Sequence, residues 1–210
     1  MSAVSQSTLR EEIREAILDS VGLLLVKYGY RKMTVEDIAH EAGIGKGTVY
    51  LYFPSKEEVA LGWFDRGHAR VYEELRAIAH SSMKPDMKLR ELLIRRVMGG
   101  FDGAQQFVQS LDELFASVRP SLLARRERYQ ANMAAIIAEV LRDGCANGVF
   151  EVHDIVRASH AIVLAIHSLL PYSLSVEQLG RRDEIEAKAR AISDILLNGL
   201  RSRSTEVPGA

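Results

Sequence analysis

The placement of helix-breaking residues limits what this chain can fold into more than any other feature. The 15 glycines and 5 prolines cluster at a few places, and the long segments between them carry apolar residues at helical rather than alternating spacing. The sequence therefore predicts an all-α protein of about nine helices. Because the chain has 210 residues and is 47% hydrophobic, it is long enough to bury a substantial core.

Three helices are expected at the N-terminal end. The first begins at the capping box that opens at Thr8, and it ends at Gly29. Thr34 is placed to cap a second, short helix. A third runs from Lys46 until Pro54 ends it, because proline cannot continue a helix.

A long fourth helix is expected to follow. Residues 55–58 form a second capping box, and the apolar stripe after it extends to about His80. Further breaks are expected at residues 81–85, 99–103, 119–121, 144–148 and 171–175.

Net charge and cysteine content narrow the class of protein. Lys+Arg 27 against Asp+Glu 28 gives a net charge of -1, so bulk positive charge cannot hold nucleic acid and any such site must be a local patch. The single cysteine, Cys145, fits a reducing cytosol and has no zinc-site spacing. The first eight residues lack the apolar stretch of a secretory signal, and the longest apolar segment, residues 155–170, contains an arginine and two histidines. We expect a cytoplasmic protein without a membrane span.

Residues 35–53 have the spacing of a helix-turn-helix. Ala39 lies where the two helices cross, and Gly43 can adopt the left-handed conformation that closes the first of them. Ile44 and Val49 fall in the small core of this module. The residues then left facing outward, where the second helix would enter a major groove, are Lys46, Gly47, Thr48, Tyr50 and Tyr52.

Charge around this module is uneven. Residues 1–70 hold 9 basic and 10 acidic residues, but no acid lies between Glu41 and Glu57, where Lys46 and Lys56 are found. Such an edge would make few phosphate contacts, so tight binding is expected to require two copies of the site. The helix N-terminus at Ser55 can hold one phosphate, with Lys56 beside it.

The run from Met33 to Glu57 resembles the N-terminal signature of the TetR/AcrR family of transcriptional regulators, and the likeness is close over about residues 8–60. It implies a helix-turn-helix DNA-binding domain at residues 1–54 and a helical ligand-binding and dimerisation domain at 55–201. The tail at 202–210 is polar and is expected to be disordered. The DNA-contact positions are Thr34, Gly45, Lys46, Gly47, Thr48, Tyr50, Tyr52 and Lys56. Gly45 and Gly47 depart from the more usual Ser or Arg, and they offer no side chain for base readout.

The C-terminal helices predict a dimer. Residues 155–170 contain 11 apolar residues among 16, and the polar ones form a narrow stripe, so this helix must be covered on two sides. A second subunit is the simplest second cover, and the last helix supplies a matching seam for a four-helix bundle. The family resemblance implies the same homodimer. The residues predicted at its interface are Ile162, Ile166, Leu169, Ile192, Leu196 and Leu200.

Three histidines at a seven-residue spacing, His153, His160 and His167, suggest a metal site, but the geometry opposes it. Successive members lie about 10.5 Å apart along one helix, whereas two ligands of one metal lie within about 4 Å. We predict no metal and no cofactor, with a site shared across the dimer axis left open.

An effector cavity is implied by the resemblance, between the long fourth helix and the helices that follow. The candidates for its lining are His68, Tyr72, Phe107, Phe115, Tyr129, Met133 and His167, each of which could equally be core. Because they combine aromatic groups with few charges, they suggest a hydrophobic or aromatic small molecule. The basic residues Arg119, Arg125, Arg126 and Arg128 are interpreted as a solvated face rather than an anion site.

The leading interpretation is a ligand-responsive repressor that acts as a homodimer on a near-palindromic double-stranded DNA operator and is released by a small effector. An enzyme is the competing class, but the sequence has no Gly-rich phosphate loop, recognisable nucleophile and base, or helix-spaced carboxylate pair to support it. A protein-interaction adaptor that uses the apolar C-terminal helices is a third class, which a lack of specific DNA binding would favour.

Overall fold

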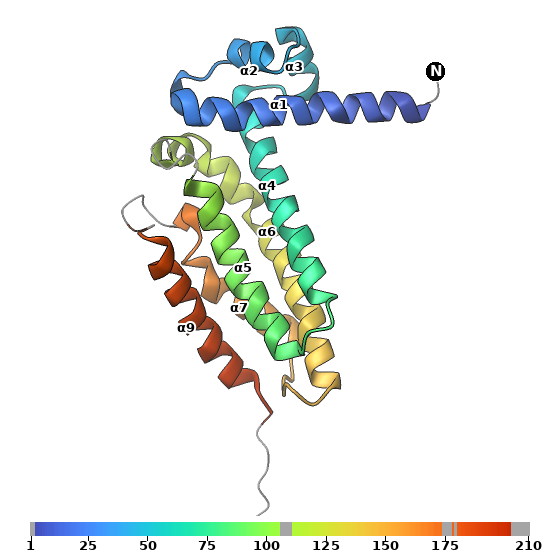
Figure 1. Ribbon diagram of the computed structural model, residues 1–210, viewed down its shortest axis with the longest axis vertical. Coiled ribbons are helices and arrows are strands. Elements are labelled where there is room, and N and C mark those ends of the chain that lie inside the picture. Colours follow the sequence, from blue (N-terminus) through green and yellow to red (C-terminus); the bar gives the residue numbers. More distant parts are fainter. Residues whose placement is uncertain (1–2, 106–110, 174–177, 179, 203–210) are drawn as a thin grey trace, which may run out of the picture. The chain divides into compact units, whose positions relative to one another are not determined.

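A computed structural model describes residues 3–105, 111–173, 178 and 180–202, and almost all of that part of the chain is helical (Figure 1). The elements in chain order are α1 (Ala3–Lys32), α2 (Val35–Glu41), α3 (Lys46–Tyr52), α4 (Lys56–Ala79), α5 (Pro85–Gln105), α6 (Leu111–Ala146), α7 (Ile155–His167), the short 3-10 helix η2 (Pro171–Ser173) and α9 (Arg182–Leu200). The all-α class is confirmed. Eight α-helices lie in the described residues, close to the nine or so predicted.

The chain divides into two compact units. Unit 1 comprises residues 1–69 and 103–125, and unit 2 comprises residues 70–102 and 126–210. The continuous helices α4 and α6 therefore each contribute to both units. Unit 1 contains the whole of the predicted DNA-binding domain.

The first helix is longer than the sequence predicted. α1 begins at Ala3 rather than at Thr8, because residues 3–8 contain neither glycine nor proline and nothing stops the helix from extending backwards. The predicted break at Gly29 is confirmed, because this residue has the non-helical angles φ 75° and ψ 165°. One more helical turn follows it and ends at Lys32.

The core of unit 1 joins its first three helices. Ile17 and Val21 of α1, Ile38 of α2 and Val49 of α3 are fully buried, and α2 packs against both α1 and α3 (Figure 1). Burying four such side chains contributes several kcal/mol, at about 1.5–3 kcal/mol each. This packing determines which face of α3 remains available to a partner.

Two predicted breaks are wrong. α5 runs through residues 99–103 to Gln105, and α6 runs through Pro120. Glycine costs a helix only about 1 kcal/mol, and Gly100 lies against Pro171, whose Cδ would be 3.3 Å from an added Cβ. Pro120 removes the hydrogen bond to the carbonyl of Ala116, but both residues are exposed, so water can solvate that carbonyl.

The connection after α6 is a tight turn. Gly148 has φ 69°, a left-handed conformation that favours glycine. Phe150 is buried against Gly144, where an added Cβ would lie 2.0 Å from its ring. The Glu151 N–H donates to the carbonyl of Leu200 at 2.9 Å. The end of α9 is thereby tied to the turn that precedes α7.

Candidate nucleic-acid interface and effector region

A complete capping box opens α2. The Thr34 Oγ1 accepts from the Asp37 N–H at 3.1 Å, while the Thr34 N–H donates to the Asp37 carboxylate at 2.8 Å. The Thr34 hydroxyl also donates to that carboxylate at 2.7 Å, and these bonds lower the pKa of Asp37. The first turn of the helix-turn-helix is thus fixed by local chemistry, as the sequence predicted.

The turn between α2 and α3 closes through glycine. Gly43 has φ 67°, its N–H donates to His40 O at 3.1 Å, and the Ile44 N–H donates to Ala39 O at 2.9 Å. This is the helix-terminating pattern in which a left-handed residue satisfies the last carbonyls. The predicted role of Gly43 is confirmed.

α3 presents most of its predicted DNA-contact residues to solvent. Val49 is fully buried against the core, while 46% of Tyr50 is exposed. Gly45, Lys46 and Gly47 are exposed, and Thr48 and Tyr52 are half-buried. The exposed backbone at the start of α3 therefore lies beside a cation, a hydroxyl and a phenol, which are groups that can bind phosphates and base edges.

Lys46 is not free in this state, because its ammonium forms an ion pair with Glu36 of α2. That bond raises the pKa of Lys46 and lowers the pKa of Glu36. The ammonium also lies 5.9 Å from the centre of the Tyr50 ring. Glu36 was not among the predicted site residues, since a link across ten residues depends on how α2 and α3 pack.

Lys56, a predicted phosphate contact, binds backbone carbonyls of unit 1 in this structure. Its ammonium donates to the carbonyls of Tyr30 and Met33, both at 3.1 Å, and lies 4.5 Å from the centre of the Tyr30 ring. It therefore caps the end of α1, where carbonyls lack helical partners. Ser55 beside it accepts from the Glu58 N–H at 3.1 Å and caps α4.

Leu51 is a further exposed residue of α3 that the sequence analysis missed. With 79% of its side chain exposed, it is the most exposed of the large apolar residues described. An apolar side chain at this place can contact a thymine methyl group. Its position between Tyr50 and Tyr52 in the sequence gave no signal, because the direction of one residue on a two-turn helix depends on the packing of the others.

Comparison with known proteins shows which regulators this chain resembles. An HTH-type transcriptional regulator of Bacillus subtilis, YhgD, is 22% identical over 144 residues, which are 67% of this chain and 73% of the relative. Residues 17–61 match the sequence model of "Bacterial regulatory proteins, tetR family". Over these residues the chain is similar to the TetR family. The matched segment covers α2, α3 and the turn between them, and the relatives that it matches are helix-turn-helix transcriptional regulators.

Solved structures of transcriptional regulators share the fold over almost the whole chain. A transcriptional regulator from Cytophaga hutchinsonii superposes with a TM-score of 0.73 and 17% identity, covering 90% of this chain and 98% of that one. The regulator FadR of Bacillus subtilis, in complex with stearoyl-CoA, gives a TM-score of 0.61 and 20% identity, covering 88% of this chain and 98% of that one.

Among the described helices, none has both the length and the apolar character required to cross a membrane.

The predicted effector residues fall into two groups. His68 and Phe115 belong to unit 1, where the Phe115 ring stacks on Phe64 at 5.8 Å and His68 Nδ1 lies 2.9 Å from Phe64 O. Tyr72, Tyr129, Met133 and His167 belong to unit 2 and are all buried. Phe107 lies outside the described residues.

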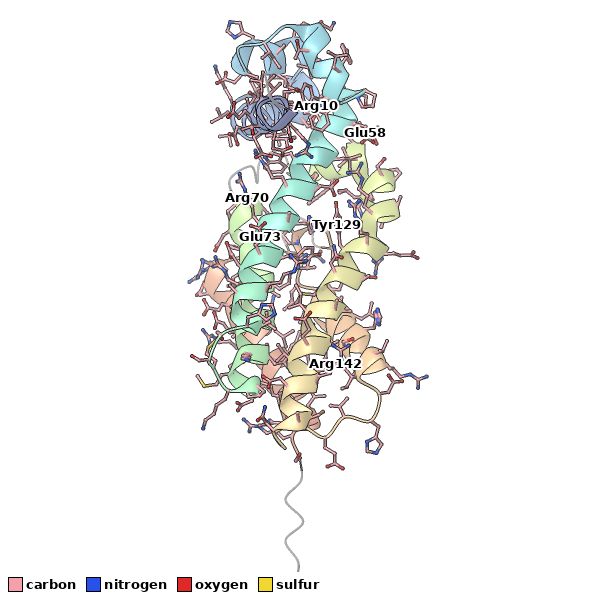
Figure 2. The ribbon with its side chains drawn as sticks, turned by 90° about the vertical axis from the view of Figure 1, so that its right-hand side faces the viewer. Arg10, Glu58, Arg70, Glu73, Tyr129 and Arg142 are labelled. Atoms are coloured by element: carbon pink, nitrogen blue, oxygen red, sulfur yellow. The ribbon has the colours of Figure 1, made fainter. Side chains whose placement is uncertain are left out.

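The group in unit 2 is connected by hydrogen bonds. The Tyr72 hydroxyl donates to Tyr129 O at 2.8 Å, which links α4 to α6, and the Gln130 amide nitrogen lies 3.4 Å from His167 Nδ1 of α7. Figure 2 shows Tyr129 level with Glu73 on the neighbouring α4. Met133 lies one turn after Tyr129, so it shares that face of α6.

His167 lies in an environment that disfavours its charged form. Burial, followed by the positive charges of Arg126 and Arg96, lowers its pKa to about 4. The histidine is therefore neutral at physiological pH. It also leaves the polar stripe predicted for its helix, because His153, Arg157, His160 and Ser168 are exposed while His167 is buried.

The three histidines considered as metal ligands, and the four arginines of residues 119–128, are described next. The part of the chain that is described contains no group of three His, Cys, Asp or Glu side chains suited to a metal ion. Arg125 pairs with Glu58 at 2.9 Å and also with Asp65, both on α4. Arg125 therefore holds α6 against α4 within unit 1, which differs from the solvated face predicted for it.

The predicted dimer residues are less exposed than the sequence suggested. Ile162, Ile166 and Leu169 are buried within the chain, and Ile192, Leu196 and Leu200 are half-buried. The large apolar residues exposed on these two helices are Val156 and Leu164 of α7, at 61% and 57%, and Ile195 of α9, at 72%. The sequence could not distinguish the inner faces of α7 and α9 from the outer ones, because both faces are apolar.

Proposed function

We propose that this TetR-family regulator is a repressor that acts as a homodimer on a near-palindromic operator and is released by a small-molecule effector. The observation that carries the proposal is the pair formed by the capped α2 and by α3, which leaves Lys46 and Tyr50 exposed and Thr48 half-buried. A short helix presented in this way fits the major groove of B-DNA.

The proposed DNA contacts are of two kinds, to phosphates and to the floor of the groove. Thr34, at the exposed start of α2, and Tyr52 are proposed to bind phosphate, while Lys46, Gly47 and Thr48 approach the floor of the groove and Tyr50 contacts a base edge or sugar. Gly45 brings backbone N–H groups close to the duplex because it has no side chain. Since one such surface carries a single cation, two copies are needed for tight binding.

The second copy is proposed to bind on the outer face of α7 and α9, two helices that pack on each other. Their exposed residues recur at helical spacing and include small and apolar side chains: Ala161 and Leu164 on α7, and Ala187, Ala191 and Ile195 on α9. Such a face suits a four-helix bundle made by two helices from each subunit.

Release by an effector is proposed to use α4. This helix is continuous from Lys56 to Ala79 and leaves unit 1 for unit 2 after Ala69. A ligand among the helices of unit 2 that displaces α4 would shift the attached helix-turn-helix. The ligand can have this effect only if it binds more tightly to the conformation that cannot bind DNA. The complex of FadR with stearoyl-CoA shows that a regulator with this fold can bind a small molecule, which supports the proposal that this chain has an effector.

The test is selection of genomic fragments by the purified chain, followed by fluorescence anisotropy with the selected duplex at physiological salt. Tyr50→Ala and Lys46→Ala are expected to abolish specific binding without unfolding the protein. Tyr28→Ala is the matched control for Tyr50, because Tyr28 is 43% exposed on α1, and it should bind normally. Unchanged affinity in both α3 variants, or no specific fragment at all, contradicts the proposal.

A further inference from the structure

The lysines and arginines of unit 1 divide into those that pair with a carboxylate and those that do not. Ion pairs are formed by Arg14, Lys46, Arg66 and Arg125. Among the described residues no such pair is formed by Arg10, Lys27, Arg31, Lys32, Lys56 or Arg119. Three of these cations lie in residues 27–32, near the end of α1, and Lys56 contacts the same end. The positive charge of unit 1 that lacks a carboxylate partner is therefore concentrated at this end of α1.

The turn that carries Arg31 and Lys32, residues 30–33, is here called the basic turn, and it is anchored on both sides. Tyr30 and Met33 are buried. The Lys56 ammonium donates to the carbonyls of both, at 3.1 Å each. Arg31 and Lys32 lie between these two buried residues and are exposed. Their side chains therefore extend into solvent from a backbone that is held in place.

Stabilisation of α1 does not account for the two exposed cations. A positive side chain at the C-terminus of a helix interacts favourably with the helix dipole and can bind the last carbonyls. Lys56 already binds two of those carbonyls. Within the described residues, Arg31 and Lys32 contact neither a carbonyl nor a carboxylate. Their charges remain available to an anion outside the chain.

The basic turn adjoins the candidate nucleic-acid interface at two points. It leads directly into Thr34, which caps α2 and is a proposed phosphate contact. Through Lys56 it also contacts the segment that follows α3, four residues beyond Tyr52. Lys32 precedes Thr34 by two residues, so their Cα atoms are at most about 7 Å apart. A lysine or arginine side chain can span most of that distance, so a phosphate at Thr34 lies within reach of the basic turn.

The predicted phosphate contacts already have partners within the chain. The hydroxyl and the N–H of Thr34 both donate to the Asp37 carboxylate. Lys46 pairs with Glu36, and Lys56 binds backbone carbonyls. Each of these groups must give up an internal partner before it binds DNA, which reduces the net gain. The two cations of the basic turn require no such exchange.

We propose that Arg31 and Lys32 bind backbone phosphates of the operator at the edge of each half-site. This inference rests on the proposed function and extends it, because the proposed contacts so far include no residue of α1. Arginine and lysine bind phosphates without regard to base sequence, and such contacts fix the position of a protein on the duplex. The basic turn thus positions the regulator on the DNA, while α3 contacts the bases.

The test is the salt dependence of binding to the selected operator, measured by fluorescence anisotropy with the full chain. Arg31→Gln combined with Lys32→Gln should lower operator affinity at least about 10-fold at physiological salt. Because a dimer then neutralises up to four fewer phosphates, the slope of log affinity against log salt should flatten by about 3 to 4 units. Affinity for an unrelated duplex should also fall, since phosphates carry no sequence information. An unchanged slope overturns the proposal.

Two further variants separate contact with DNA from net charge and from folding. Arg119→Gln combined with Arg142→Gln removes the same charge from exposed positions of α6 and should leave the affinity and the slope almost unchanged. Arg31→Lys combined with Lys32→Arg keeps both charges and should bind like wild type. The Tm should be similar in all variants, because every altered side chain is exposed. An equal loss of affinity in the α6 variant, or a loss that accompanies unfolding, contradicts the assignment.

Operator selection is measured separately, which distinguishes the two proposals. A chain that binds a specific operator with the same salt slope in wild type and in the double glutamine variant of the basic turn refutes the phosphate contact alone. A chain that binds every duplex alike, and loses that binding in this variant, refutes the repressor function alone. A chain that binds no duplex refutes both.

Discussion

At the scale of single residues, the proposed DNA contact of Lys46 competes with its ion pair to Glu36. In the free protein its ammonium pairs with Glu36, and the bond shifts the pKa values of both groups in the direction of the charged pair. A phosphate can replace Glu36, but the carboxylate then remains close to the DNA backbone and repels it. The acid-free stretch of the sequence thus lies beside an acid from the preceding helix, and we expect this acid to weaken the proposed binding to DNA.

Glu36→Gln should therefore tighten operator binding. Removing the carboxylate releases Lys46 and removes a repulsive charge, so affinity should rise by roughly threefold or more, and the plot of log affinity against log salt should steepen by about one unit for each additional phosphate that the protein neutralises. Anisotropy titrations across a salt series measure both quantities. Glu41→Gln, at the exposed end of α2, makes the same change in net charge, and an equal rise in affinity there would show that Lys46 is not involved.

His167 should make stability depend on pH. Its folded pKa is about 4, below the unfolded value of about 6.5, so the unfolded chain binds the proton first. Stability is fully present above about pH 6.5 and is lost as the pH falls towards 4. Urea unfolding at pH 7 and pH 5 should differ by about 1–2 kcal/mol after allowance for solvent screening.

The variant His167→Gln should remove that difference, because glutamine does not titrate. His160→Gln, an exposed change on the same helix, should leave the pH dependence unaltered. A wild type that is equally stable at pH 7 and pH 5 would show that His167 is more solvated than its burial indicates.

At the scale of elements, local signals predicted well and packing signals did not. The cap at Thr34, the turn at Gly43 and the break between α4 and α5 follow from residues adjacent in the sequence. The continuity of α5 and α6 could not be predicted, because the cost of a glycine or proline depends on the solvent and neighbours of that turn. Lys56 contacts the end of α1, a segment more than twenty residues away, which no local pattern specifies.

Close packing at the end of α6 leads to a matched pair of glycine substitutions. Gly144→Ala places a Cβ 2.0 Å from the buried Phe150 ring and should lower the free energy of unfolding by about 1–3 kcal/mol. Gly67→Ala, in the interior of α4 with nothing within 4 Å of the added Cβ, should raise it by about 0.5–1 kcal/mol. Urea denaturation followed by circular dichroism distinguishes the two. Equal effects would mean that the ring moves aside without cost.

At the scale of the whole molecule, the proposed function depends on holding two copies of α3 at the spacing of successive major grooves. Half-sites on one face of B-DNA lie about 34–36 Å apart. A dimer therefore binds the operator more tightly than a monomer only while both copies of α3 can contact their half-sites at the same time. We propose that the exposed faces of α7 and α9 hold the two subunits together. The inner face of α7, which contains Ile162 and Ile166, already packs within the chain.

A charge on each of the two outer faces should separate the subunits. Leu164→Glu combined with Ile195→Glu places unpaired carboxylates in the proposed bundle, so sedimentation velocity should show a monomer that keeps its helical circular dichroism. Operator affinity should fall by at least about 100-fold, because each helix-turn-helix then binds alone. Met87→Glu, at a residue of α5 that is 54% exposed, should remain dimeric and bind normally. A double variant that stays dimeric would place the interface on another surface, and a monomer with full affinity would remove the need for two copies.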